Sequence, residues 1–170
     1  MKYEDIVIPT LVESGVLQRQ TLQEFLINHG IQPGSGCILN KLCEHSVITE
    51  TAIARASATM CNLNFIDLSK ERLSHKAMLH MKSDIARFLR CIPFRQVGDV
   101  VMVAVSEMPS NATVECIRFF CGEDVVIFIT TTSCVDKTLR RHYPESAESK
   151  KLSRSSLGRI VWLRPTTAKK

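Results

Sequence analysis

The chain has 170 residues, of which 45% are hydrophobic and 23% charged, and a length of this kind buries enough surface to fold without disulfides or a metal. Its longest apolar runs have strand length, and residues 1–5 do not open a signal peptide, so a globular cytoplasmic protein is expected. The net charge of +5 lies at one end, because residues 1–143 hold 15 Lys and Arg against 15 Asp and Glu, whereas residues 144–170 hold 7 against 2.

A repeat organises residues 1–60. When the sequence is shifted by 31 residues, similar residues coincide: Leu11 falls on Leu42, Gly15 on Ser46, Val16 on Val47, Leu17 on Ile48 and Leu22 on Ile53. This coincidence predicts two copies of one helix-turn-helix unit. Neither copy can bury its apolar stripe alone, so the two are expected to pack as a four-helix unit.

Each copy has its own helix signals. In the first copy, Pro9 favours the opening turn of a helix that ends at Gly15, and residues 18–28 form the second helix. In the second copy, residues 37–44 and 49–59 repeat the pattern, with Thr49 as the N-cap.

The segment after the repeat leads into a sheet. Residues 61–68 are expected to be extended, and two short helices follow over residues 74–81 and 83–90, each begun by a serine. His75 and His80 do not share a helical face, so solvated side chains are favoured over a ligand pair.

Three strands are predicted beyond residue 90. Residues 91–97 and 100–105 form a hairpin around Gly98-Asp99, and residues 125–132 form the third strand. Between them, residues 111–121 have helical spacing, and Gly122 stands where a left-handed C-cap belongs. The motif at residues 133–136 has the form of a capping box and opens a last helix that runs to Tyr143.

The tail is polar and Ser-rich at first, which is typical of a linker or a disordered segment. It then carries a short apolar stretch around Trp162, between Arg159 and Arg164. Two interpretations stay open: a frayed end, or a docking peptide that adds to a sheet edge or lies on an anionic surface.

The expected fold class is therefore α+β. We predict a helical repeat subdomain over residues 1–60, a small mixed α/β subdomain with three strands over residues 61–143, and a basic, flexible tail over residues 144–170. The neutral charge of the folded part makes nucleic acid an unlikely partner, because binding by the tail alone would be weak and salt-sensitive.

The seven cysteines are odd in number and form no Cys-x-x-Cys pair, which favours free, buried thiols in a reducing compartment. A metal site that uses Cys43 with His45, or Cys116 with Cys121, is the sharper alternative. Neither spacing matches a zinc ligand pair, so no metal is predicted.

The order of these segments resembles a known family. The repeated helix pair is followed by residues 60–68, which read Met-Cys-Asn-Leu-Asn-Phe-Ile-Asp-Leu, then by Ile92-Pro93-Phe94 and by an apolar strand that ends in Ser106-Glu107. Over residues 7–143 this order is similar to the N-terminal domain of type II secretion and type IV pilus assembly ATPases. The resemblance implies docking to a protein of the inner-membrane assembly platform, or to the cognate ATPase, at the inner face of the inner membrane.

The motor chemistry of that family has no counterpart in the sequence. No Gly-x-x-x-x-Gly-Lys-Ser/Thr motif is present, so nothing in the 170 residues would hold a β-phosphate and magnesium. Nucleophile and acid-base motifs are also missing, and the chain is expected to be non-enzymatic.

Some members of the family bind cyclic di-GMP through the repeat, and this is the alternative function. The residues that remain of that pattern are Leu11, Gly15, Leu22, Leu26, Leu42 and Ile53, and His29 offers a further donor for a phosphate. Against it, Ile6 stands where the family has Arg, Ile8 and Leu39 replace leading glycines, and His29 and Met60 replace the two Gln. The remaining apolar positions are equally explained by packing, so the first expectation is an interaction module without a cofactor.

Overall fold

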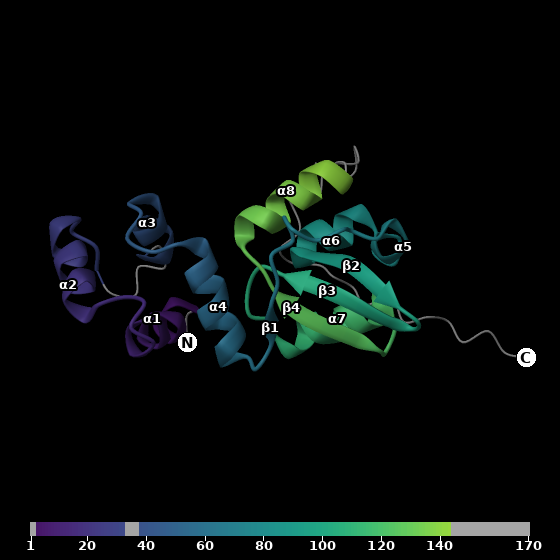
Figure 1. Cartoon of the computed structure of the whole chain (residues 1–170), viewed down its shortest axis with the longest axis horizontal. Helices are drawn as coiled ribbons and strands as arrows, with labels where there is room; N and C mark the ends of the chain where they lie inside the picture. Colours follow the sequence, from purple (N-terminus) through teal and green to yellow (C-terminus); the bar gives the residue numbers. More distant parts are fainter. Residues whose placement is uncertain (1–2, 33–37, 144–170) are drawn as a thin grey trace, which may run out of the picture.

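A computed structural model describes residues 3–32 and 38–143 of the chain, and Figure 1 shows the arrangement of its elements. The helices of the repeat lie at one end of the long axis and the sheet with its own helices lies at the other, with α4 between them. The α+β class is thereby confirmed. The predicted tail, with Arg159, Trp162 and Arg164, lies outside the described residues. In the described part, no helix has both the length and the apolar character that a membrane span requires.

Four helices form the repeat: α1 (Tyr3–Glu13), α2 (Arg19–Asn28), α3 (Ile38–Glu44) and α4 (Glu50–Met60). They share a hydrophobic cluster of their own, which is built by Val7, Leu11, Leu17, Phe25, Ile31, Ile38, Leu39, Leu42, Ile48 and Ala56. The four-helix unit therefore has a core separate from that of the sheet, as the sequence predicted.

The two copies have the same backbone hydrogen bonds at their turns. In the first, the Leu17 amide donates to Leu11 at 3.0 Å, and in the second the Ile48 amide donates to Leu42 at 3.4 Å. The shift of 31 residues grows to 32 at the far end, because α4 is one residue longer than α2. By the helix ends, the counterpart of the C-cap residue His29 is therefore Cys61, and not Met60 as the constant shift implied.

Helix boundaries differ from prediction at two places. Pro9 lies inside α1 and does not open it, since the helix already begins at Tyr3. The second serine signal was also wrong, because the N-cap of α6 is Lys82 and Ser83 is the first helical residue. Two N-caps are confirmed: Thr49 accepts from the Ala52 amide and Ser74 from the Ala77 amide.

The sheet has four strands, not three. They are β1 (Asn64–Phe65), β2 (Cys91–Val97), β3 (Val100–Val105) and β4 (Val125–Ile129), and they lie in the order β1-β4-β3-β2. β2 and β3 form the predicted antiparallel hairpin, while β3 and β1 both run parallel to β4. The prediction missed β1 because a two-residue strand has no alternation to read, and only its pairing with Phe128 and Ile129 defines it.

The remaining helices cover the sheet. They are α5 (His75–Met78), α6 (Ser83–Leu89), α7 (Asn111–Cys121) and α8 (Thr132–His142). α8 starts earlier than expected, since the N-cap is Thr131, whose hydroxyl accepts from the Cys134 amide at 3.3 Å. The predicted capping box at Ser133 and the predicted strand through Thr132 were therefore both wrong. Gly122 is the C-cap of α7 with φ of 101°, but its ψ of 169° is not left-handed helical.

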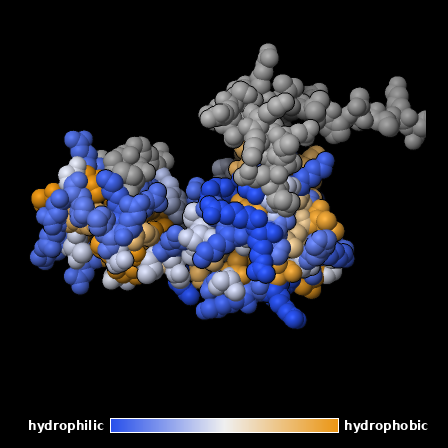
Figure 2. Space-filling view, turned by 90° about the horizontal axis from the view of Figure 1, so that it is seen from above, coloured by the Kyte–Doolittle hydropathy of each residue, from blue (hydrophilic) through white to orange (hydrophobic). Residues whose placement is uncertain are grey.

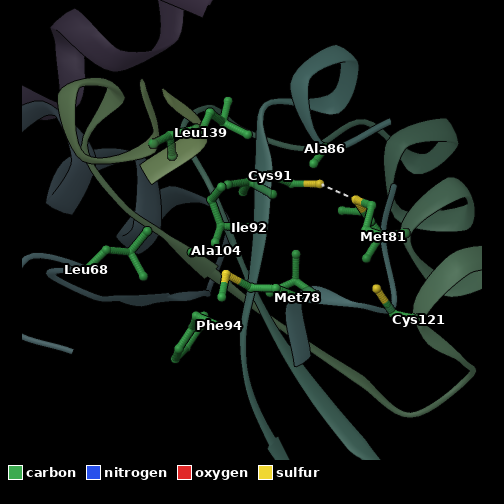
Figure 3. Close-up of a cluster of buried hydrophobic side chains, with 14 of the residues drawn as sticks. Leu68, Met78, Met81, Ala86, Cys91, Ile92, Phe94, Ala104, Cys121 and Leu139 are labelled. Atoms are coloured by element: carbon green, nitrogen blue, oxygen red, sulfur yellow. Dashed lines mark hydrogen bonds between the residues drawn. The ribbon is translucent and has the colours of Figure 1, made fainter. Parts of the chain in front are cut away.

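A second hydrophobic cluster joins these helices to the sheet, and Figure 3 shows part of it. Cys91 is fully buried there, with its thiol 3.2 Å from the Met81 sulfur. Burial raises the pKa of the Cys91 thiol from 9.0 to about 12 and that of the nearby Cys121 to about 11. Both side chains therefore stay protonated and pack as small hydrophobes, in line with the sequence prediction.

Candidate functional site

A cavity of about 700 Å³ lies where the helical repeat meets the sheet. Helices α1, α3 and α4 form one side of it. The other side consists of residues that directly follow β3 and β4 and of the first residue of α8. The lining residues are Tyr3, Glu4, Leu39, Asn40, Cys43, Glu44, Glu50, Ile53, Ala54, Ser106, Glu107, Thr130, Thr131 and Thr132. We call this space the junction cavity.

Glu4 enters the junction cavity from the first turn of α1. Its side chain is only 7% exposed, and its Oε1 accepts a hydrogen bond of 3.2 Å from the amide of Leu39 in the first turn of α3. A helix N-terminus offers amide donors and a positive dipole end, which explains why a carboxylate is tolerated there. The second oxygen, Oε2, is buried and has no hydrogen-bond partner within the described structure.

Glu50 plays the same part for α8. Its Oε2 accepts from the Ser133 amide at 3.2 Å, and its Oε1 accepts from the Ser133 hydroxyl at 2.7 Å. The two residues are 83 positions apart, so this pair connects α4 of the repeat to the first turn of α8. Both oxygens of Glu50 are therefore engaged in holding the two subdomains together.

The strand ends supply hydroxyl groups. Ser106 follows β3 and Thr130 follows β4, and both are buried. The Thr130 amide donates to the Val105 carbonyl at 2.9 Å, but its hydroxyl has no partner among the described residues. Across the cavity, the Tyr3 hydroxyl lies 2.6 Å from the Ser57 hydroxyl, and burial raises the pKa of Tyr3, so the phenol stays neutral.

Acidic side chains set the electrostatic character of the junction cavity. Glu44 and Glu107 are exposed at its rim, in addition to Glu4 and Glu50, and the described lining contains no Lys, Arg or His. Four carboxylates around one space repel an anion and favour a cation or a neutral donor. Phosphate groups are therefore poorly matched to this lining.

The residues predicted for a nucleotide do not converge on this cavity. Leu11 and Leu42 are fully buried in the core of the repeat, while Leu22 and Leu26 pack against that core. Of the seven predicted residues, only Ile53 lines the junction cavity. The remaining two, Gly15 and His29, lie at the ends of α1 and α2, where Gly15 has φ of 73° and closes a turn.

His29 instead takes part in an aromatic group. Its ring stacks on Phe25, with centroids 4.3 Å apart, and lies 4.4 Å from the ring of His45 in the other copy. His29 Nδ1 is 3.0 Å from the Phe25 carbonyl oxygen, so one ring nitrogen already has a backbone partner when it carries the proton. The group connects the end of the first copy to the turn of the second.

The proposed metal pairs do not form a metal site in the described chain. Cys43, Cys61, Cys91, Cys116, Cys121 and Cys134 are all free thiols, and Cys37 lies outside the described residues. Within residues 3–32 and 38–143, no three His, Cys, Asp or Glu side chains come close enough together to hold an ion.

Sequence reasoning missed the junction cavity, although one signal was present. Ser106-Glu107 and Thr130-Thr131 directly follow two apolar strands, and the carboxyl ends of neighbouring parallel strands meet at the same edge of a sheet. No comparable signal marked Glu4, because its partner Leu39 lies 35 residues away on another helix.

The fold and the sequence together define the class. Residues 61–149 match the family model of the MshEN domain, so the chain belongs to the MshEN domain family. The structure of MshE with cdg, cyclic di-GMP, has a TM-score of 0.60 and 20% identity, over 81% of this chain and 98% of that one. The N-terminal domain of XpsE has a TM-score of 0.58 and 14% identity, over 84% and 97%. Comparison with curated proteins gives no match.

These comparisons confirm the resemblance to the N-terminal domain of type II secretion and type IV pilus assembly ATPases. The likeness to MshE and XpsE shows a shared fold that spans both the helical repeat and the sheet.

Proposed function

We propose that the chain is a non-catalytic interaction domain of a type II secretion or type IV pilus-like system. In this proposal it acts in the cytoplasm, where it docks to a protein of the inner-membrane assembly platform or to the cognate ATPase. The observation that carries the proposal is membership of the MshEN domain family in a sequence without a phosphate-gripping motif.

The surface offers anchors for such a partner. The most exposed large apolar side chains are Ile27 at 78%, Phe119 at 76%, Leu79 at 71% and Phe88 at 70%, and they belong to four different helices. Figure 2 shows hydrophobic residues in small groups among polar ones, on both the repeat and the sheet. Aromatic and aliphatic anchors of this kind dominate binding energy when a partner covers them.

The second candidate function is a degenerate receptor for cyclic di-GMP. Its support is the shared fold with MshE, whose structure contains that ligand. Two observations weigh against it: Leu11 and Leu42 are fully buried, and the junction cavity is acidic. A cyclic dinucleotide carries two phosphates, which four carboxylates would repel, although a carboxylate can accept from a guanine edge.

Two measurements separate these functions. Affinity purification after native expression should recover a secretion or pilus platform protein, and recovery of no such component would count against docking. Calorimetry with cyclic di-GMP at tens of micromolar should give no heat. A saturable heat would replace docking alone by the receptor function.

A further inference from the structure

We propose that the junction cavity is a binding site for an extended organic cation, one that carries two or more separated ammonium or guanidinium groups. This chemistry is that of a polyamine or of Lys and Arg side chains in a basic peptide. The inference does not depend on the proposed docking function, because it concerns only the described lining of the cavity.

The first argument is that two buried polar atoms face this space without partners. Glu4 is 7% exposed with Oε2 unpartnered, and Thr130 is 0% exposed with Oγ1 unpartnered, within the described structure. A buried oxygen without a hydrogen bond costs about 1–3 kcal/mol, and more for a charged group. Both atoms belong to the cavity lining, so a donor placed in the cavity would satisfy them.

The second argument is the sign of the charge. Glu4, Glu44, Glu50 and Glu107 line the space, and no described lining residue is basic. Glu50 is already committed to Ser133, and the Glu4 Oε1 is committed to the Leu39 amide. The Glu4 Oε2 and the rim carboxylates of Glu44 and Glu107 are left to attract a cation.

The third argument concerns shape. In the described structure no three acidic or metal-ligating side chains converge, so these carboxylates are spread around the cavity and do not form a metal cage. A ligand must therefore bring its charges to separate places. A volume of about 700 Å³ lies within the usual range for small-ligand sites, which leaves room for an extended molecule.

Titration of the full-length protein with spermidine, by calorimetry at low salt, tests the proposal. A Gly-Arg-Gly-Arg peptide forms the second arm, and ethylamine and MgCl2 are controls that carry one positive centre. Saturable binding of spermidine or of the peptide, at least about tenfold tighter than either control, is expected because several contacts act together. The stronger of the two arms tells whether a free polyamine or a basic side chain is the natural source.

Variants localise the binding. Glu4→Gln removes the charge but leaves an acceptor for the Leu39 amide, and Glu107→Gln changes an exposed rim residue, so neither should unfold the protein. Each should weaken spermidine binding by about fivefold or more. The matched control is Glu123→Gln, which removes the same charge before β4, at the opposite end of that strand from Thr130, and should leave the affinity unchanged.

Three results would overturn the proposal. No saturable heat in either arm would mean that water alone fills the cavity. Equal affinity for MgCl2 and spermidine, or equal weakening by Glu123→Gln, would mean a general counterion effect. A platform protein that binds while the cavity binds no cation would leave the docking function intact.

Discussion

The Ser133 amide and hydroxyl both donate to Glu50, at 3.2 and 2.7 Å, and so connect the last helix of the repeat to the first turn of α8. A carboxylate at a helix N-terminus is favoured by free amides and by the helix dipole. Few polar links join the two hydrophobic clusters, which gives this pair a large share in fixing their relative position.

Glu50→Ala should lower the free energy of unfolding by about 1–3 kcal/mol, because it leaves both Ser133 donors unpaired. Urea denaturation measures the change, and a double-mutant cycle with Ser133→Ala should show that the two losses are not additive. The control is Glu44→Ala, at an exposed position of the same cavity, which should stay within about 0.5 kcal/mol. Additive losses would mean that the pair does not couple.

The two repeat turns predict opposite effects of substitution. Gly15 and Ser46 both have positive φ, 73° and 56°, and an added Cβ at Gly15 would meet no atom within 4 Å. Gly15→Ala should therefore destabilise by about 1 kcal/mol through the backbone alone. Ser46→Gly should instead be neutral or stabilising by up to about 1 kcal/mol. Thermal denaturation of both variants decides, and equal destabilisation would contradict structural equivalence of the turns.

Stability should fall in alkaline solution. Burial raises the pKa of Cys91 from 9.0 to about 12, and it also raises the pKa values of Cys121 and Tyr143. The unfolded chain loses these protons first, so their contribution is complete below pH 9 and is lost as pH rises toward 12. Each group adds a slope of roughly 1.4 kcal/mol per pH unit to urea unfolding.

A variant tests the origin of that slope. Cys121→Ala removes one of the three groups, so its unfolding free energy should depend less steeply on pH above 9 than that of the wild type. An unchanged slope, or stability that rises with pH, would show that these groups do not ionise on unfolding.

The sequence predicted most elements because strong local signals agreed with the tertiary structure. Thr49 and Ser74 act as the N-caps that their side chains indicated, and Gly98 closes the hairpin with φ of 60°. Where two signals lay close together, the choice failed. Thr131 and Ser133 are both good N-cap residues, and the hydrogen bonds of Ser133 to Glu50 engage it elsewhere.

The site was harder to predict than the fold, since its residues meet only in space. Glu4 and Leu39 are 35 residues apart, and Glu50 and Ser133 are 83 apart. By contrast, the proposed nucleotide residues Leu11, Leu42 and Ile53 follow one helical repeat, and the same pattern serves the core. An apolar position shared by a ligand site and a core cannot be assigned from spacing alone.

The basic tail provides a further prediction. Deletion of residues 153–170 removes five positive charges and no negative one, and it leaves every described residue in place. Circular dichroism and thermal denaturation should be unchanged, whereas recruitment to the partner or to the membrane should weaken. Unchanged localisation after the deletion would make the tail irrelevant to docking.

The central claim is that this MshEN domain binds a platform protein and does no chemistry of its own. The most direct test mixes the purified full-length chain with the cytoplasmic part of a candidate platform protein, followed by size-exclusion chromatography and an ATP hydrolysis assay. We predict a stable complex without ATP turnover, which Ile27→Ser, Phe88→Ser or Phe119→Ser disrupts at one of the three positions. No complex with any platform protein of the system, or hydrolysis of ATP by the chain alone, would contradict the account.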